Sequence, residues 1–380
     1  MKTFMKKYNL QFYFILFFLL DKLILLPIFK FNITETLPGT PYLETLENKE
    51  PERFHTDDYK NHKKVWLFGS SRSLWYYVLP VPKNTLADPF LDRHAKEKLN
   101  QYHFVPFASP GSNTSIYYVR LNQLLERGYK PDLIALELSI YAFNHNNRFV
   151  HSSKIEGFPL MFTLKHSNEM PFEFSRDIIT SRIFATTRYK ITVTGIKHNL
   201  FGIRPPGQNA MLEQLFSGSA DPFQAFFDRM TGSERVDKIY ADKEFMDFRE
   251  DAVFTDLKEY MFRIKLPLPI LKKEFFTNYE YDSNMFYFLE LILQKAHQEK
   301  IPVVIWIQKE HPEMKKIISE NNMEQKWLEK ISKISRNYNA SIVNFNGDKA
   351  LQCNYYGDVF HASGRCITEM SWKMIETLEK

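Results

Sequence analysis

Two short stretches at opposite ends of the chain carry side chains that could act together on an ester or acyl group. The first is segment 65–73, V-W-L-F-G-S-S-R-S, in which an apolar run stops at Gly69 and small hydroxyl residues follow. The second is G-D-V-F-H-A-S-G, in which two residues separate Asp358 from His361. A serine becomes nucleophilic at neutral pH when a histidine takes its proton and an acid orients the imidazole. Ser71, His361 and Asp358 are therefore the candidate catalytic residues.

The serine turn also has a purely structural interpretation. Serines often cap the helix that follows a strand, and Ser70, Ser71 and Ser73 could do no more than this. Ser70 lies next to Ser71 and also carries a hydroxyl group, so it is an alternative nucleophile.

A scaffold for these residues is predicted from Lys64 onward, where strand-like and helix-like segments alternate. The predicted strands are Val65–Phe68, His103–Ala108, Asp132–Leu138, Pro302–Ile307 and Ser341–Phe345. The periodic helices are Thr114–Arg127, Asn284–Lys300 and Glu324–Arg336. This alternation predicts an α/β fold with a doubly wound, mostly parallel five-stranded sheet and right-handed crossovers. Ligands of such sheets bind outside the carboxyl ends of the strands.

Several histidines follow the predicted strands and compete for the role of base. His311 follows the fourth strand, and His145 and His151 lie beyond the third. His361 is favoured by its position between the last strand and the last helix. That helix carries a core-facing stripe of Ile367, Met370, Met374 and Leu378.

The G-x-S block at Gly69–Ser71, the glycine of a second block at Gly111 and the terminal D-x-x-H followed by Gly364 resemble the SGNH/GDSL hydrolase superfamily. The resemblance covers residues 64–144 and 284–380. It implies that Ser71 attacks a carbonyl, that His361 is the general base and that Asp358 orients the imidazole. It also implies an oxyanion hole that includes the backbone N–H groups of Ser71 and Gly111.

Two features depart from the family pattern. Ser70 stands where the family's aspartate normally lies, and the G-S-S turn is similar to that of D-alanyl transfer protein D and its membrane-anchored relatives. The third block should read G-x-N-D after the third strand, but the chain has S-I-Y-A-F-N. Asn144 and Asn113 are the amides that could complete the oxyanion hole, unless both are ordinary turn residues. A hole without an amide is expected to be slower by a factor on the order of a hundred.

The N-terminus predicts a membrane anchor. Lysines precede the apolar run Phe12–Leu20, which Asp21 and Lys22 interrupt before Leu23–Phe29 resumes it. Basic residues before the run and the absence of an A-x-A site favour an uncleaved single-pass signal anchor with its tip in the cytoplasm, over residues 1–29. A cleaved signal peptide or a buried hydrophobic helix are the alternatives.

The remaining chain divides into a stalk and a domain. Residues 30–63 are polar and contain three prolines, so we predict a linker there. Residues 64–380 form the predicted domain. Residues 145–283 are too long for one crossover and predict a largely helical insertion, either a lid over the site or a subsidiary core.

The two cysteines bracket the candidate acid and base. If the domain lies outside the cytoplasm, Cys353 and Cys366 could form a disulfide; two free buried thiols fit the count equally well. No metal-binding spacing and no nucleotide-binding loop occurs, so neither a metal nor a cofactor is predicted. The excess of 50 basic over 45 acidic residues is small and spread out, which gives no support for nucleic acid as a partner.

Together these features predict a protein of the bacterial cytoplasmic membrane whose domain faces the periplasm. The resemblance implies a serine esterase or O-acyltransferase that acts on a cell-envelope glycan or lipid through an acyl-serine. It also implies a membrane-bound acyltransferase as a partner, as in alginate O-acetylation. The alternative is a non-catalytic envelope assembly or binding protein that keeps the same fold.

Overall fold

The computed structural model describes residues 2–23, 61–78, 81, 88–109, 111–147, 157–188, 267–320, 322–347, 351–353, 355–356 and 359–379. The chain forms two compact units. Unit 1 combines residues 1–40 with 154–222, and unit 2 combines residues 41–153 with 223–380.

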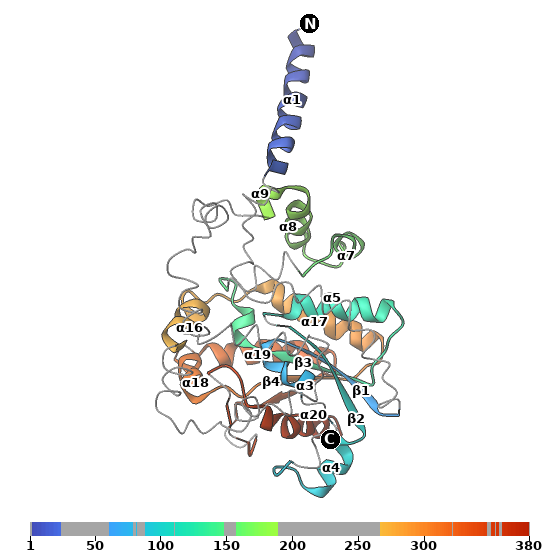
Figure 1. Ribbon diagram of the computed structural model, residues 1–380, viewed down its shortest axis with the longest axis vertical. Helices are drawn as coiled ribbons and strands as arrows, with labels where there is room; N and C mark the ends of the chain where they lie inside the picture. Colours follow the sequence, from blue (N-terminus) through green and yellow to red (C-terminus); the bar gives the residue numbers. More distant parts are fainter. Residues whose placement is uncertain are drawn as a thin grey trace. The chain divides into compact units, whose positions relative to one another are not determined.

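Unit 2 is built on a five-stranded sheet in which all neighbouring strands are parallel (Figure 1). Its strands lie in the order β2-β1-β3-β4-β5. Their bounds are β1 Lys63–Gly69, β2 Tyr102–Ala108, β3 Leu133–Leu138, β4 Val303–Ile307 and β5 Ser341–Asn344. The α/β class and the five predicted strands are thereby confirmed. Every residue of β3 and β4 is buried, as expected of parallel strands covered on both faces.

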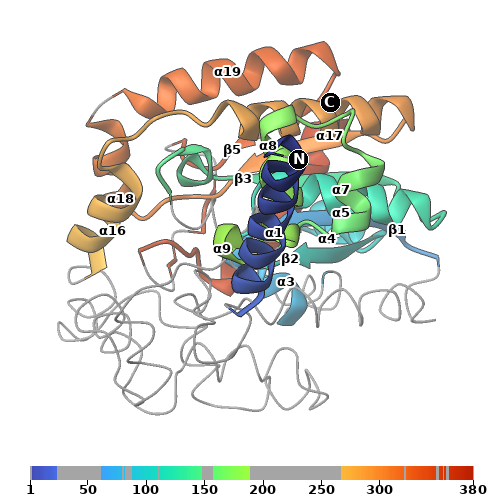
Figure 2. The same cartoon turned by 90° about the horizontal axis from the view of Figure 1, so that it is seen from above.

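Helices cover both faces of the sheet. On one face, α3 (Trp75–Val78), α4 (Arg93–Leu99) and α20 (Ile367–Glu379) share a core with inward-facing strand residues such as Val65 and Leu67. Figure 1 shows α5 (Thr114–Glu126) and α17 (Ser283–Gln298) on the opposite face. There the Tyr117 ring of α5 lies 6.1 Å from that of Phe68. Helix α19 (Met323–Asn337) lies beside α17 (Figure 2).

The three predicted periodic helices correspond to α5, α17 and α19. Asn113 caps α5 and Asp282 caps α17, each by accepting a hydrogen bond from a backbone N–H of the first turn. Further short elements lie near the strand ends: α16 Pro267–Phe276, α18 Pro312–Ser319 and the 3-10 turns η2 Ser71–Ser73, η3 Ile140–Phe143 and η5 Gly364–Cys366.

Unit 1 is helical in its described parts. It contains α1 (Lys2–Leu23), α7 (Leu160–Lys165), α8 (Phe172–Ile183) and α9 (Ala185–Arg188). None of the helices within the described ranges combines the length and apolarity needed to cross a bilayer. Residues 24–60, which include the end of the predicted anchor and most of the predicted stalk, lie outside the described residues.

Candidate active site

The serine turn lies where β1 leaves the sheet. Ser70 caps the short 3-10 turn η2, and Ser71 is its first residue. Gly69 is required here because a Cβ at this position would lie 2.0 Å from Ser73 Oγ and 2.8 Å from a carboxylate oxygen of Glu137. The glycine therefore lets the chain turn directly over the end of the neighbouring strand.

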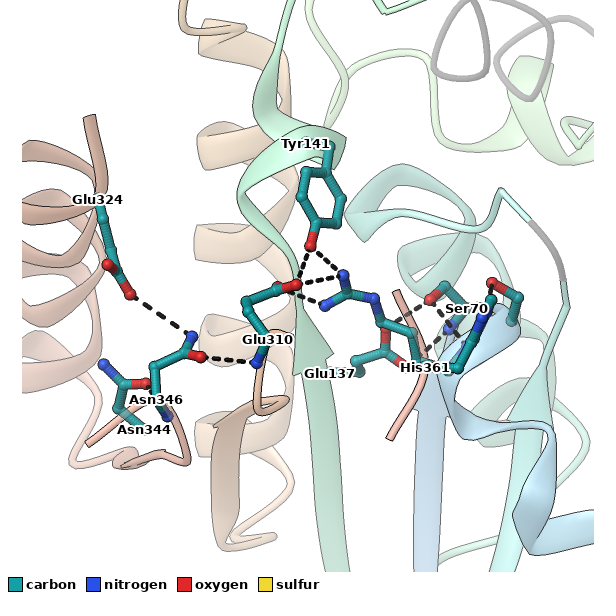
Figure 3. Close-up of polar contacts among 10 residues, drawn as sticks. Ser70, Glu137, Tyr141, Glu310, Glu324, Asn344, Asn346 and His361 are labelled. Atoms are coloured by element: carbon teal, nitrogen blue, oxygen red, sulfur yellow. Dashed lines mark hydrogen bonds and ion pairs between the residues drawn. The ribbon is translucent and has the colours of Figure 1, made fainter. Parts of the chain in front are cut away.

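Ser71 and His361 meet at this turn. The Nε2 atom of His361 lies 2.9 Å from Ser71 Oγ, which is hydrogen-bond distance. Figure 3 shows His361 beside the serine turn. The two residues are 290 positions apart in sequence, and the parallel sheet brings their loops to the same edge. This geometry lets the imidazole accept the serine proton. Asp358 lies outside the described residues.

The neighbouring serine has a different partner. Ser70 Oγ donates a hydrogen bond to one carboxylate oxygen of Glu137, and the Ser70 N–H donates to the other at 3.0 Å (Figure 3). Ser73 Oγ also donates to Glu137, a buried residue of β3. The carboxylate of Glu137 thus holds Ser70 and Ser73, the serines just before and just after residues 71 and 72. Ser71 is the serine in contact with a histidine.

Glu137 was missed in the sequence reasoning, although the sequence does carry a signal for it. It is the one charged residue in the strand L-I-A-L-E-L, which is otherwise apolar. A buried carboxylate is stable only where several donors surround it, so its presence in a buried strand indicates a polar structure at that end of the sheet.

The loop that carries His361 is fixed at both ends. Cys353 and Cys366 form a disulfide with a Cα–Cα distance of 5.3 Å, so the alternative of two free thiols is wrong. The buried carboxylate of Glu369, on α20, accepts hydrogen bonds from the N–H groups of Gln352 at 2.6 Å and Cys353 at 2.7 Å. These contacts hold the base of the loop against α20.

Within the loop, the backbone pairs on both sides of the histidine. Tyr356 and Ala362 form an antiparallel bridge, and the Ser363 N–H donates to the Tyr355 carbonyl oxygen at 3.0 Å. The two residues that directly follow His361 are therefore held by backbone contacts with Tyr355 and Tyr356.

Two backbone N–H groups are available for an oxyanion. Within the described ranges, the N–H groups of Ser71 and Gly111 donate to no protein acceptor. Gly111 has a φ of 71°, a left-handed conformation that favours glycine. The N–H of Ser109 donates to the Gly69 carbonyl oxygen at 3.2 Å, which places the second block beside the serine turn.

The two candidate amides differ. Asn144 is buried, its Nδ2 donates to the Phe275 carbonyl oxygen at 2.8 Å, and its Oδ1 accepts from the N–H groups of Asn146 and Glu280. Asn144 thus anchors the loop after β3, and its role as an oxyanion-hole donor stays a prediction. Asn113 lies in the second block, and its Oδ1 accepts from the N–H and hydroxyl of Ser115. Its place in the hole stays a prediction.

A buried ion pair begins at the residue after Ser71. The guanidinium of Arg72 donates to both carboxylate oxygens of Glu310, at 2.7 and 2.9 Å, and the Tyr141 hydroxyl contacts both residues (Figure 3). Burial opposes the charged form of Arg72, but the charge of Glu310 outweighs it, so the pKa of Arg72 is raised. Burial raises the pKa of Tyr141 as well. These contacts fix the side chain of the residue after Ser71.

Glu310 is itself held from the far side. Its N–H donates to Asn346 Oδ1 at 2.7 Å, and Asn346 Nδ2 donates to Glu324 Oε1 at 3.5 Å (Figure 3). Burial and the nearby charge of Glu310 raise the pKa of Glu324. A polar network thus runs from α19 and the loop after β5 to the serine turn.

Aromatic rings form a wall beside the histidine. The rings of Tyr141, Phe275 and Phe360 lie 5.4 to 5.6 Å apart by their centroids. Phe275 and Phe360 are half-buried, and Phe360 directly precedes His361. These rings form an apolar surface beside His361.

The competing histidines have other partners. His311 caps α18, where its Nδ1 accepts from the Glu313 N–H at 3.2 Å. His145 Nδ1 lies 3.6 Å from a carboxylate oxygen of Asp282. His151 lies outside the described residues. The described ranges hold no group of three or more His, Cys, Asp or Glu side chains arranged to bind a metal ion.

Two comparisons bear on the identity of the chain. No curated protein matches its sequence. The family model described as "Protein of unknown function (DUF1574)" matches residues 8–378, almost the whole chain, and the protein therefore belongs to that family.

Proposed function

We propose that this protein is a serine esterase or O-acyltransferase of the SGNH/GDSL type that works through an acyl-Ser71 intermediate. The observation that carries the proposal is the 2.9 Å contact between Ser71 Oγ and His361 Nε2 at the carboxyl edge of a parallel sheet. The strand order 2-1-3-4-5 is the flavodoxin-like order, in keeping with an SGNH fold.

In this mechanism His361 moves a proton twice. It takes the proton of Ser71 as Oγ attacks the carbonyl carbon of the substrate, and the N–H groups of Ser71 and Gly111 stabilise the resulting oxyanion. The oxyanion then collapses, the ester C–O bond breaks, and the leaving alkoxide receives the proton from His361. Water or an acceptor hydroxyl next gives its proton to His361 and attacks acyl-Ser71, which releases the serine. Asp358 orients the imidazole.

We place this activity at the bacterial cytoplasmic membrane, on its periplasmic side, and take a cell-envelope glycan or lipid as substrate. The basic tip and apolar run of residues 1–29 support the anchor. The Cys353–Cys366 disulfide supports an oxidising compartment. The aromatic wall supports a substrate with an apolar ring face or an acyl chain. A membrane-bound acyltransferase is the partner that would supply acyl groups in a transfer reaction.

A second candidate is a non-catalytic envelope assembly or binding protein on an SGNH fold. The observation that favours it is the third block, which lacks G-x-N-D and whose Asn144 binds the backbone of residues 275–280 instead. A missing amide donor weakens an oxyanion hole, although a scaffold does not require the Ser71–His361 contact.

Labelling of the purified full chain with a fluorophosphonate probe separates the two candidates. We expect the wild type and Ser70→Ala to be labelled and Ser71→Ala not to be. Ser70→Ala is the matched control because it removes a hydroxyl one residue away that binds Glu137. Failure to label the wild type, together with no turnover of acetyl or longer acyl esters, would favour the scaffold. Product analysis with an added sugar acceptor then distinguishes transfer from hydrolysis.

A further inference from the structure

Arg72 and Glu310 form a buried ion pair that takes no part in the proton transfers of the proposed mechanism. Each of the two residues is 4% exposed, and the guanidinium donates to both carboxylate oxygens. The loss of hydration by both charges offsets most of their attraction, so a pair of this kind adds little net stability. The geometry that a bidentate pair fixes is the better explanation for its place next to Ser71.

The side chain of Arg72 joins the segments that follow four strands of the sheet. Arg72 itself follows β1, Tyr141 lies in η3 after β3, Glu310 follows β4 and Phe360 follows β5. The Cζ atom of Arg72 lies 4.6 Å from the centroid of the Tyr141 ring and 5.9 Å from that of the Phe360 ring. At these distances a cation is attracted to an aromatic ring. Figure 3 shows Glu310 and Tyr141 turned toward each other at this junction.

The Arg72–Phe360 contact lies next to the Ser71–His361 contact in the sequence of both segments. Arg72 directly follows Ser71, and Phe360 directly precedes His361. Two successive residues of the serine turn therefore contact two successive residues of the histidine loop. A shift of Phe360 would move His361 as well, because one peptide bond joins them.

Further contacts restrain each side of the Arg72–Phe360 contact. The N–H of Glu310 donates to Asn346 Oδ1 at 2.7 Å, so the partner of Arg72 is itself fixed. The Phe360 ring packs against the rings of Tyr141 and Phe275, at 5.4 and 5.5 Å between centroids. A contact between two restrained groups sets the distance between the segments that carry them.

We propose that Arg72 is a positioning residue for the reaction of Ser71. Held by Glu310, its guanidinium keeps Phe360 in place and thereby keeps His361 Nε2 within hydrogen-bond distance of Ser71 Oγ. Proton transfer needs this distance, and a shift of about 1 Å slows a reaction by up to about a hundredfold. The inference rests on the proposed function, in which His361 is the base.

A double-mutant cycle with His361→Ala tests this role. The rate of fluorophosphonate labelling of Ser71 is measured in the full chain for Arg72→Lys and for the double variant Arg72→Met, Glu310→Gln. Each set of changes is then repeated in the His361→Ala background. Lysine keeps the positive charge but cannot form the bidentate pair. The double variant removes both charges, so no unpaired charge stays buried.

We expect both Arg72 variants to label Ser71 about tenfold to a hundredfold more slowly than wild type. In the His361→Ala background the same changes should alter the slow residual rate by no more than about twofold, because the contact that Arg72 positions is already lost. The matched control is Arg93→Met, Glu97→Gln, which removes an exposed Arg–Glu pair of α4 and should label at the wild-type rate.

Three results would overturn the inference. A wild-type rate in both Arg72 variants would show that Arg72 does not position the site, and a wild-type rate in Arg72→Lys alone would show that its charge suffices. Equal losses in both backgrounds would show that Arg72 acts on the oxyanion or on folding rather than through His361. In all three cases the proposed function stands.

The proposed function fails separately. If wild type is not labelled, or if His361→Ala is labelled as fast as wild type, the proposed function is wrong and the inference falls with it. Cooperative thermal unfolding confirms that each variant is folded. Where an Arg72 variant does not fold, Phe360→Leu removes the ring and leaves the ion pair intact, and the cycle is repeated with it. The same pattern of rates is expected, and wild-type labelling of Phe360→Leu would overturn the inference.

Discussion

At the scale of single residues, the carboxylate of Glu137 determines the environment of the serine turn. It accepts hydrogen bonds from the Ser70 N–H and from the hydroxyls of Ser70 and Ser73. Because Ser70 is held in this way, its hydroxyl is directed toward β3, while Ser71 contacts His361. The choice between two adjacent serines thus depends on a residue 67 positions away.

Glu137→Gln tests this arrangement. The amide keeps the size of the carboxylate but has only one acceptor oxygen, so at least one buried donor loses a good partner. We expect a loss of about 1–3 kcal/mol in the free energy of unfolding and slower fluorophosphonate labelling. Urea unfolding measures the change in the free energy of unfolding. Glu97→Gln on the exposed side of α4 is the control and should be neutral. Equal stability and labelling of Glu137→Gln and wild type would contradict the role of Glu137.

His103 predicts a pH dependence of stability. Burial lowers its pKa to about 4 from 6.5. Above pH 6.5 His103 is neutral in both the folded and the unfolded chain, so it does not affect stability. Below pH 6.5 the unfolded chain binds a proton at His103 before the folded protein does. Stability is therefore lost as the pH falls from about 6.5 to 4, by at most about 2 kcal/mol near pH 5. Denaturant unfolding at pH 7 and near pH 5 should show a smaller loss in His103→Gln than in wild type or His145→Gln. An equal loss in all three would contradict the prediction.

At the scale of elements, the disulfide and Glu369 keep the His361 loop in place. We expect the double variant Cys353→Ser, Cys366→Ser to lose about 3 kcal/mol of stability in the loop-entropy model. Its labelling of Ser71 should also slow, because His361 would leave hydrogen-bond distance for part of the time. The control is Ser332→Ala on α19, outside the loop that the disulfide closes. Wild-type labelling rates in the double variant would show that the disulfide does not position the base.

The strands with clear apolar runs and the helices with clear periodicity were predicted well. The apolar runs that became β1 to β5 and the periodic segments that became α5, α17 and α19 end within about two residues of their predicted bounds. Short helices such as α4 and α18 were not predicted, because seven or eight residues give too few turns for a periodic signal.

Contacts between distant polar residues could not be read from the sequence. The Arg72–Glu310 pair joins residues 238 positions apart, and nothing in local spacing links them. For the same reason the sequence offered Asn144 as an oxyanion-hole amide after the third strand but gave no sign of its observed partners, Phe275 and Glu280, which lie beyond a long intervening segment. Ser71 and His361 were paired because family order, rather than spacing, indicated it.

At the scale of the whole molecule, parallel topology explains how two ends of the chain meet. All five strands point the same way, so the loops after β1 and β5 emerge at one edge, although β3 and β4 separate these strands. The proposed nucleophile therefore follows the first strand and the proposed base follows the last. We therefore propose that His361 activates Ser71 as a nucleophile.

Peptide mapping of the fluorophosphonate adduct tests this claim most directly. Trypsin cleaves after Lys64 and Arg72, and the peptide Val65–Arg72 contains only Ser70 and Ser71 as serines, so fragment ions identify the modified residue. We expect the adduct on Ser71 in wild type and in His145→Ala, and a loss of about a hundredfold or more in the labelling rate of His361→Ala. An adduct on Ser70 or outside this peptide, or undiminished labelling of Ser71 in His361→Ala, would contradict the account.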